Sequence, residues 1–192
     1  MAKYSKFKTK IHPIAFIIAA IFLIVIVVLA ITAIPSDQDK IYNEYYQQQI
    51  RTQDFNRELL IEKDHIYKSV KVDELKNKIS NDDLVIVYYG ASWCPNCLNE
   101  ISVYDSELRK NETLFEMSPN IFYLKKLDTE HAKGFEELAE ELAFDIPVIT
   151  PALLIFYQGQ LVEATYVVGT QQPKNIRTAV RDFYNEVLKE IN

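Results

Sequence analysis

The sequence predicts an α/β domain over residues 64–192, in which one mixed sheet is flanked by helices on both faces. Three observations support this fold class. Residues 84–89 form a continuous run of apolar β-branched and aromatic residues, which is typical of a central strand buried on both faces. Segments with strand-like and helical periodicity alternate along this region. The dipeptide Gln158-Gly159 separates two further apolar runs and predicts a hairpin.

The elements of this domain follow one another in the order β-α-β-α-β-α-β-β-α. The first strand is expected over 65–70 and an amphipathic helix over 72–79, ahead of the central strand. A helix follows with apolar positions from Ile101 to Phe115. The remaining elements are a strand over 120–127, a helix over 134–144, strands over 152–157 and 161–168, and a last helix over 172–191.

Charge is distributed unevenly along the chain. The formal net charge of the 192 residues is −6, which argues against a general nucleic-acid binder. All 27 acidic residues follow Pro35, whereas four lysines lie in the first ten positions. Residues 35–192 therefore carry 17 basic against 27 acidic residues, a net charge of −10. The Lys-rich start and the acidic remainder of the chain therefore indicate two different environments.

The segment from Ile14 to Ile34 contains no charge, and Thr32 is its only polar side chain. A helix of about 20 such residues crosses the hydrocarbon core of a bilayer. We expect residues 11–34 to be a single-pass transmembrane anchor, with the Lys-rich tail 1–10 in the cytoplasm and the domain outside. A cleavable signal peptide is the alternative, but its apolar region usually spans only about 7–15 residues.

Residues 35–63 are rich in Gln, Asn, Asp and Tyr and show patchy helical spacing at Ile41, Tyr45 and Gln49. We interpret this segment as a solvated juxtamembrane helical spacer. A coiled coil is an alternative, although the heptad pattern does not persist. Tyr42, Tyr45 and Tyr46 could instead act as aromatic anchors at the membrane interface.

The chemistry of the chain centres on its two cysteines, Cys94 and Cys97, which open a helix after the central strand. Their spacing places both sulfurs on one helical turn. Unpaired backbone N–H groups and the helix dipole stabilise a thiolate at the first position. Pro95 suits the first turn, where its missing N–H is not needed. We therefore expect Cys94 to be an exposed nucleophile and Cys97 a buried resolving thiol.

Three other uses of this cysteine pair fit the sequence less well. A zinc site needs two more ligands, and the only histidines are His12, His65 and His131. A purely structural disulfide across so short a loop constrains the unfolded chain little. A cysteine hydrolase needs a histidine base near the thiol. Redox exchange without a metal or other cofactor is the favoured interpretation.

Residues 64–192 resemble the thioredoxin family in two motifs at a characteristic separation. Trp93-Cys94-Pro95-Asn96-Cys97 follows a strand, and Thr150-Pro151 opens the apolar strand 152–157. A hairpin glycine, Gly159, and Gly169 before the last helix complete the pattern. The resemblance implies a thioredoxin fold and thiol–disulfide exchange through a redox-active Cys94–Cys97 disulfide.

The resemblance also implies how substrates dock. It implies a cis Thr150-Pro151 peptide facing Cys94, with the Thr150 backbone pairing with an extended substrate segment. Trp93 and Pro95 would contribute to the same docking surface. Pro147 is a second candidate for the cis position, but Pro151 adjoins the apolar strand and fits better.

Two departures from the family bear on the direction of the reaction. Tyr88 occupies the position where many thioredoxins bury an acidic residue beneath the resolving cysteine, and a tyrosine is a poor base at neutral pH. The dipeptide between the cysteines is Pro-Asn instead of the Gly-Pro of reducing thioredoxins. Both features weakly favour an oxidase or isomerase over fast reduction, and leave the direction open.

The functional hypothesis is a membrane-tethered extracytoplasmic thiol–disulfide oxidoreductase. It would act on cysteines of exported proteins or peptides through a Cys94 mixed disulfide that Cys97 resolves, and it would need a redox partner. The alternative is a thioredoxin-fold binding or accessory module of a secretion or bacteriocin export system, with a static disulfide. The Lys-rich anchor and the family resemblance favour a bacterial source.

Overall fold

The computed structural model describes residues 13–32, 34–127, 134–147, 149–165 and 173–192. The chain divides into two compact units, residues 1–36 and residues 37–192. The first unit contains α1 (Pro13–Thr32), whose described side chains are exposed. Within the described part of the chain, a search for helices long and apolar enough to span a membrane found none. The expected cytoplasmic tail, 1–10, lies outside the described residues.

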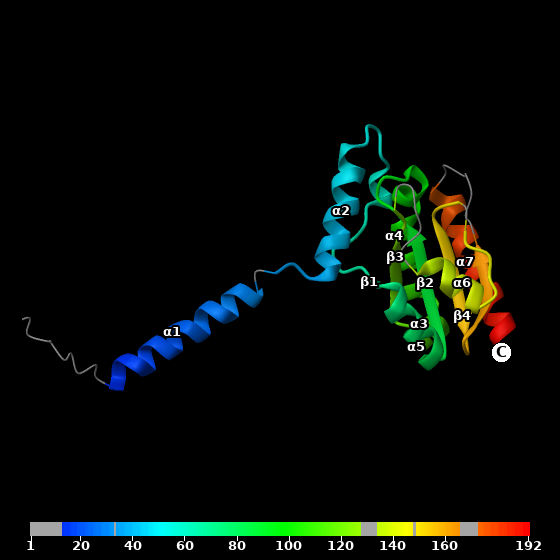
Figure 1. The fold of residues 1–192 in the computed structure, drawn as a ribbon. Helices are drawn as coiled ribbons and strands as arrows, with labels where there is room; N and C mark the ends of the chain where they lie inside the picture. The colour runs from blue at the N-terminus through cyan, green and yellow to red at the C-terminus, as the bar shows by residue number, and fades with distance from the viewer. Residues whose placement is uncertain (1–12, 33, 128–133, 148, 166–172) are drawn as a thin grey trace, which may run out of the picture. The chain divides into compact units, whose positions relative to one another are not determined.

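The second unit contains the expected alternation of strands and helices (Figure 1). Its elements are α2 (Asp37–Arg51), η1 (Arg57–Leu59), β1 (Tyr67–Ser69), α3 (Val72–Asn81), β2 (Leu84–Gly90), α4 (Pro95–Lys110), α5 (Glu112–Met117), β3 (Ile121–Lys125), α6 (Phe135–Glu141), β4 (Ala152–Tyr157), β5 (Gln160–Thr165) and α7 (Pro173–Ile191).

One expected helix is interrupted in the structure. The helix expected to reach Phe115 is divided at Asn111, because this residue ends α4 and its side chain accepts the Leu114 N–H at 3.2 Å, which starts α5. The expected end of the last strand, residue 168, and the expected start of the last helix, residue 172, lie outside the described residues.

The five strands form one mixed sheet in the order β1-β3-β2-β4-β5. β3 pairs in parallel with both β1 and β2, whereas β4 is antiparallel to β2 and to β5. Gln158 and Gly159 both have positive φ at the β4–β5 turn, as a two-residue hairpin requires. This strand order and polarity, with helices on both faces, constitute a thioredoxin-like fold, so the expected fold class is confirmed for the domain.

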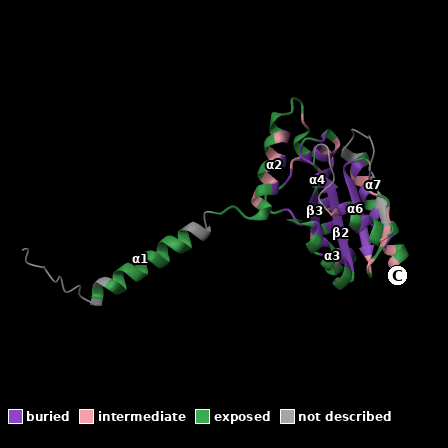
Figure 2. Cartoon of the chain, viewed as in Figure 1, coloured by how far each residue is buried: buried purple, intermediate pink, exposed green. Residues whose placement is uncertain are grey.

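Two hydrophobic cores lie on opposite faces of the sheet. The first lies between the sheet and α4 and α7, and the second lies between the sheet and α3 and α6. Every residue of β2 is buried, as Figure 2 shows, because its alternating side chains enter one core or the other. Tyr88 points into the first core and Tyr89 into the second. The carboxyl end of the central strand thus leads directly into the loop that carries the cysteines.

The spacer interpretation of residues 35–63 is wrong for α2. Ile41, Tyr45 and Gln49, one turn apart, form a buried face of this helix. Gln49 donates to the carbonyl oxygens of Leu59 and Leu98 at 3.0 and 2.7 Å, and its side-chain oxygen accepts the Ile61 N–H at 3.0 Å. Because all these groups are satisfied inside the first core, the compact unit begins at Asp37 and not at residue 64.

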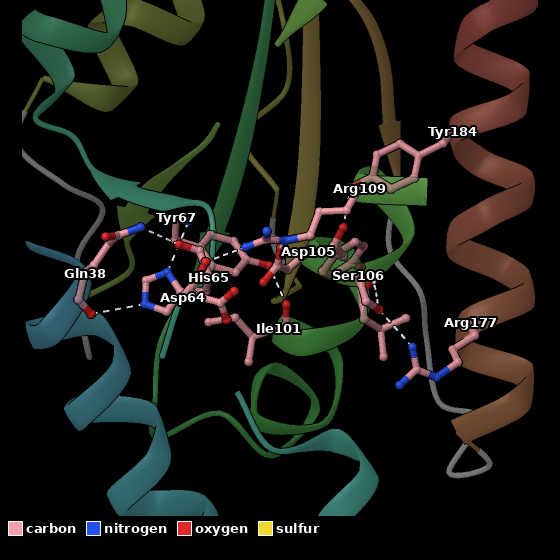
Figure 3. Close-up of polar contacts among 12 residues, drawn as sticks. Gln38, Asp64, His65, Tyr67, Ile101, Asp105, Ser106, Arg109, Arg177 and Tyr184 are labelled. Carbon is pink, nitrogen blue, oxygen red and sulfur yellow. Dashed lines mark hydrogen bonds and ion pairs between the residues drawn. The ribbon is translucent and has the colours of Figure 1, made fainter. Parts of the chain in front are cut away.

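A polar cluster joins α2 to β1 (Figure 3). The Nε2 atom of His65 lies 3.0 Å from the Gln38 carbonyl oxygen, and its Nδ1 accepts the Tyr67 N–H at 3.2 Å. Burial lowers the pKa of His65, and Arg109 lowers it further. Arg109 bonds Asp105 through Nε at 2.6 Å and also donates to the Asp64 carbonyl. The neutral imidazole is therefore part of the contact between α2 and the sheet.

Candidate redox site

The loop between β2 and α4 brings the two cysteines to the carboxyl end of the central strand. β2 ends at Gly90, where an added Cβ would lie only 2.7 Å from Cε1 of Tyr88, so glycine is required by this close approach. Cys94 is the N-cap of α4, and Pro95 is its first residue. Cys97 lies in the first turn of that helix, and both cysteines are free thiols in this structure.

The Cys94 sulfur has three polar contacts. It accepts the Cys97 N–H at 3.3 Å and the Thr150 hydroxyl at 3.5 Å, and as a thiol it donates to the Thr150 carbonyl at 3.3 Å. The Thr150-Pro151 peptide is cis and faces Cys94, as the resemblance implied. Cys94 is only 6% exposed, so the expectation of an exposed nucleophile is wrong: the cis-proline segment covers its sulfur.

The pKa values of the two thiols are shifted in opposite directions. A hydrogen bond from the Cys97 side chain lowers the pKa of Cys94 to about 6, against the opposing effect of burial. The Thr150 hydroxyl and the backbone N–H groups of Asn96 and Cys97 lower it further. Burial raises the pKa of Cys97, which is 0% exposed, far above its usual range. At neutral pH the site therefore holds a Cys94 thiolate and a protonated Cys97.

The residues predicted to form the docking surface differ in their exposure to solvent. Trp93 is 48% exposed and Pro95 is also exposed, whereas Thr150 and Pro151 are buried. Ile149, which the sequence analysis did not single out, is also 48% exposed next to Thr150. Apolar side chains thus remain exposed on both segments that meet at Cys94, the cysteine loop and the cis-proline segment.

One buried carboxyl near the cysteines was missed in the sequence. Glu100 lies one turn after Cys97 on α4, is 2% exposed, and accepts a hydrogen bond from the Tyr104 hydroxyl at 3.0 Å. Burial raises its pKa to about 8; the Tyr104 bond opposes this rise and the negative charge of Cys94 adds to it. The helical spacing from Cys97 was the available signal, but nothing in the sequence shows that the carboxyl is buried.

A second missed residue, Glu44, comes from α2. Its carboxylate accepts hydrogen bonds from the Ser92 hydroxyl at 2.7 Å and from the Lys125 ammonium at 2.6 Å. Ser92 lies in the loop just before Cys94, so α2 reaches the redox site itself. The side chain of Glu44 is 30% exposed, which leaves the carboxylate in contact with solvent.

Tyr88 lies at the centre of an aromatic group beneath Cys97. Its hydroxyl donates to the Cys97 carbonyl at 3.4 Å. Its ring centroid lies 5.4–5.9 Å from those of its neighbours, which are Tyr67, Tyr104 and Tyr123. Burial raises the pKa of Tyr88, and the nearby Cys97 sulfur raises it further, so this phenol stays protonated.

No protein-family profile matches this chain, and no curated protein matches it. Solved structures of similar backbone include a thioredoxin from Plasmodium falciparum, at 21% identity and a TM-score of 0.43, covering 62% of this chain and 97% of that one. A mutant thioredoxin from Halobacterium salinarum matches at 23% identity and a TM-score of 0.35, covering 61% and 89%. These values are too low to carry an argument, and the fold assignment rests on the strand order and polarity described above.

Proposed function

We propose that this protein is a thiol–disulfide oxidoreductase that exchanges disulfides through Cys94. The observation that carries the proposal is the environment of the Cys94 sulfur. It caps α4, accepts the Cys97 N–H and faces the Thr150-Pro151 segment. A thiolate stabilised in this way is nucleophilic at neutral pH, and a second thiol lies within the same helical turn.

The reaction follows from the two cysteines. The Cys94 thiolate attacks a substrate disulfide, a Cys94–substrate disulfide forms, and the other substrate sulfur leaves as a thiolate with the electron pair. Cys97 then loses its proton and attacks the Cys94 sulfur, which forms the Cys94–Cys97 disulfide and releases the second substrate thiolate. Run in reverse, the same steps place a disulfide in the substrate.

The low pKa of Cys94 favours the oxidising direction. A thiolate stabilised in the reduced protein makes that form more stable, so the disulfide form becomes a stronger oxidant. The Pro-Asn dipeptide between the cysteines agrees with this direction. We therefore propose an oxidase or isomerase that acts on cysteines of exported proteins or peptides, with a separate redox partner that reoxidises or reduces Cys94–Cys97.

Substrates would dock on the apolar side chains that flank Cys94. Trp93, Pro95 and Ile149 are exposed there, and the Thr150 backbone would pair with an extended peptide. Because the cis-proline segment covers the Cys94 sulfur, an incoming disulfide has to approach along this backbone.

We also propose that residues 11–34 tether the domain to the outer face of a cell membrane. The uncharged stretch from Ile14 to Ile34, the lysines before it and the acidic chain after it support this proposal. An impermeant maleimide added to intact cells would label Cys94 if the domain is outside. Labelling only after lysis would reject this orientation.

Trapping tests the exchange chemistry. The full chain carrying Cys97→Ser, incubated with oxidised glutathione, should accumulate a glutathione adduct on Cys94, because the resolving thiol is missing. A Cys94→Ser, Cys97→Ser chain is the matched control. Absence of the adduct would reject exchange and favour the accessory module with a static disulfide. In the wild-type chain, a glutathione equilibrium near the potential of reducing thioredoxins, about −270 mV, would reject the oxidase direction.

A further inference from the structure

A short turn connects the central strand to Cys94. β2 ends at Gly90, and the Cys94 N–H closes the turn by donating to the Ala91 carbonyl oxygen at 3.1 Å. Ser92 and Trp93 are therefore the two central residues of this turn. The side chain of Trp93 is half-exposed, whereas Ser92 is buried. The conformation of this turn sets the direction in which the chain enters Cys94.

The buried Ser92 is held from outside the turn by Glu44 of α2. The Ser92 hydroxyl donates to Oε1 of Glu44 at 2.7 Å, and the Lys125 ammonium donates to the same oxygen at 2.6 Å. Lys125 is the last residue of β3 and is paired in register with Gly90. One carboxylate oxygen thus joins α2, the end of β3 and the turn before Cys94.

Helix α2 also contacts the chain on the other side of the cysteine pair. Gln49, which lies five residues after Glu44, donates to the Leu98 carbonyl oxygen at 2.7 Å. Leu98 directly follows Cys97 on α4. Side chains of one helix therefore hold the segment before Cys94 and the segment after Cys97, so the position of the cysteine pair relative to α2 is fixed at two points.

The contacts of Glu44 contribute more to geometry than to stability. The side chains of Glu44 and Lys125 are 30% and 48% exposed, and water screens an ion pair of this kind, so it adds little to the free energy of unfolding. The hydrogen bond to Ser92, in contrast, is directed at a buried residue of the turn. The main effect of Glu44 is therefore expected on the conformation of the turn.

We propose that Glu44 is a positioning residue of the redox site, which holds Ser92 and thereby fixes the turn that sets Cys94 against Thr150. The inference rests on the proposed function, because positioning matters only if Cys94 reacts. The Cys94 sulfur lies 3.3 Å from the Cys97 backbone nitrogen and 3.5 Å from the Thr150 hydroxyl. A loosened turn would hold these contacts for a smaller share of the time, and a misplacement of about 1 Å can slow a reaction by about 100-fold.

The first experiment measures the reaction of Cys94 in the full chain, with Cys97→Ser as the parent. Formation of the disulfide between Cys94 and glutathione, from oxidised glutathione, is followed by mass spectrometry at about pH 8. Cys94 has a pKa of about 6 and is a thiolate under this condition. Ser92→Ala and Glu44→Ala should each slow the reaction by about tenfold. The chain with both substitutions should be no slower than either alone, because both remove the same hydrogen bond.

The second experiment reads the turn itself through Trp93, the only tryptophan of the chain. Time-resolved fluorescence anisotropy separates local motion of the indole ring from tumbling of the whole molecule. The amplitude of the local motion should increase in Ser92→Ala and in Glu44→Ala. This measurement needs no reaction at Cys94, so it tests the turn independently of the proposed function.

Matched variants separate positioning from charge and from loss of structure. Glu44→Gln keeps an acceptor for the Ser92 hydroxyl but no charge, and should restore most of the reaction rate. Asp37→Ala removes a carboxylate of the same helix that bonds Lys40 at 2.9 Å, and should match the parent in both experiments. Ser92→Ala leaves the side chain of Gln49 in place, so it reports on the turn even if Glu44→Ala loosens α2.

Four results would overturn the proposal. One is a rate in Ser92→Ala within about twofold of that of the parent. Another is a rate in Glu44→Gln as low as in Glu44→Ala, which would assign the effect to charge. Additive effects of Ser92→Ala and Glu44→Ala would show that the two residues act separately. A parent that forms no glutathione disulfide, while the variants loosen Trp93 as expected, would reject the proposed function and leave Glu44 a structural role alone.

Discussion

Thr150 contacts the Cys94 sulfur through two groups, a carbonyl that accepts a hydrogen bond and a hydroxyl that donates one. Its carbonyl oxygen lies 3.3 Å from the sulfur and its hydroxyl lies 3.5 Å away. The carbonyl can only accept, so it favours the neutral thiol, whereas the donated hydroxyl hydrogen bond favours the thiolate. One residue of the cis-proline segment therefore acts on both protonation states of Cys94, in addition to the larger effect of the Cys97 side chain.

Thr150→Val should raise the pKa of Cys94 by about one unit from its value near 6, because it removes the donated hydroxyl bond and leaves the carbonyl. The pH dependence of Cys94 alkylation by iodoacetamide, in a Cys97→Ser background for both chains, measures the shift. Thr150→Ser retains the hydroxyl and should titrate like its parent. Equal midpoints for the valine and threonine chains would contradict this account of the thiolate.

Glu100→Gln should stabilise the protein at alkaline pH. The pKa of Glu100 rises from 4.5 to about 8 on burial, so the unfolded chain releases a proton that the folded chain retains between these values. The wild type therefore loses stability as the pH increases through this window, by about 5 kcal/mol. Urea unfolding of both chains at several pH values measures the difference. Parallel stability curves would show that Glu100 is ionised normally.

Gln49→Ala should separate α2 from the domain. The substitution removes the side-chain partner of the Ile61 N–H and one hydrogen bond to each of the Leu59 and Leu98 carbonyl oxygens, of which Leu59 retains the bond from the Ser102 hydroxyl at 2.9 Å. We expect a loss of about 3 kcal/mol in the free energy of unfolding and faster proteolysis within α2. Gln47→Ala changes an exposed residue on the same helix and is the control. A loss no larger than that of the control would mean that α2 docks without this side chain.

His65 should make the protein sensitive to mild acid. Its pKa in the folded state is below 6.5, so the unfolded chain binds the extra proton first as the pH falls. The contribution of the neutral His65 to the free energy of unfolding is therefore fully present above pH 6.5. It is lost as the pH falls from 6.5 through the lower pKa of the folded state. Arg109, whose charge lowers the pKa of His65, keeps its positive charge throughout this range. The glutamine side chain in His65→Gln can donate and accept hydrogen bonds as the neutral imidazole does. The melting temperature of this variant should therefore not fall over the same pH range.

Most of the fold could be predicted from the sequence, because the elements that build the two cores have regular apolar spacing. The central strand, the helix opened by the cysteines and the cis Thr150-Pro151 peptide were all expected, and the structure confirms them. These features depend on local sequence or on a motif whose two parts are recognisable.

The docking of α2 could not be predicted, because its buried face includes a polar residue, Gln49, and its partners are far away in the sequence. The same reason applies to the site. Only the folded chain shows that Glu100 is buried, that Glu44 reaches Ser92, and that the ring of Tyr45 lies 5.9 Å from that of Tyr123. Burial of single polar side chains depends on tertiary contacts, which leave no periodic signal.

The contacts of α2 also have a consequence for the order of events during synthesis. Gln49 docks on Leu98, 49 residues later, and Glu44 bonds Lys125, 81 residues later. The ribosome therefore produces α2 well before the surface that receives it, and the helix must wait, with its apolar face uncovered, until β3 has been translated. The Glu44–Lys125 contact therefore forms late, although the Thr150 contacts of Cys94 become available later still. A nascent chain stalled before Lys125 would carry both cysteines without that contact.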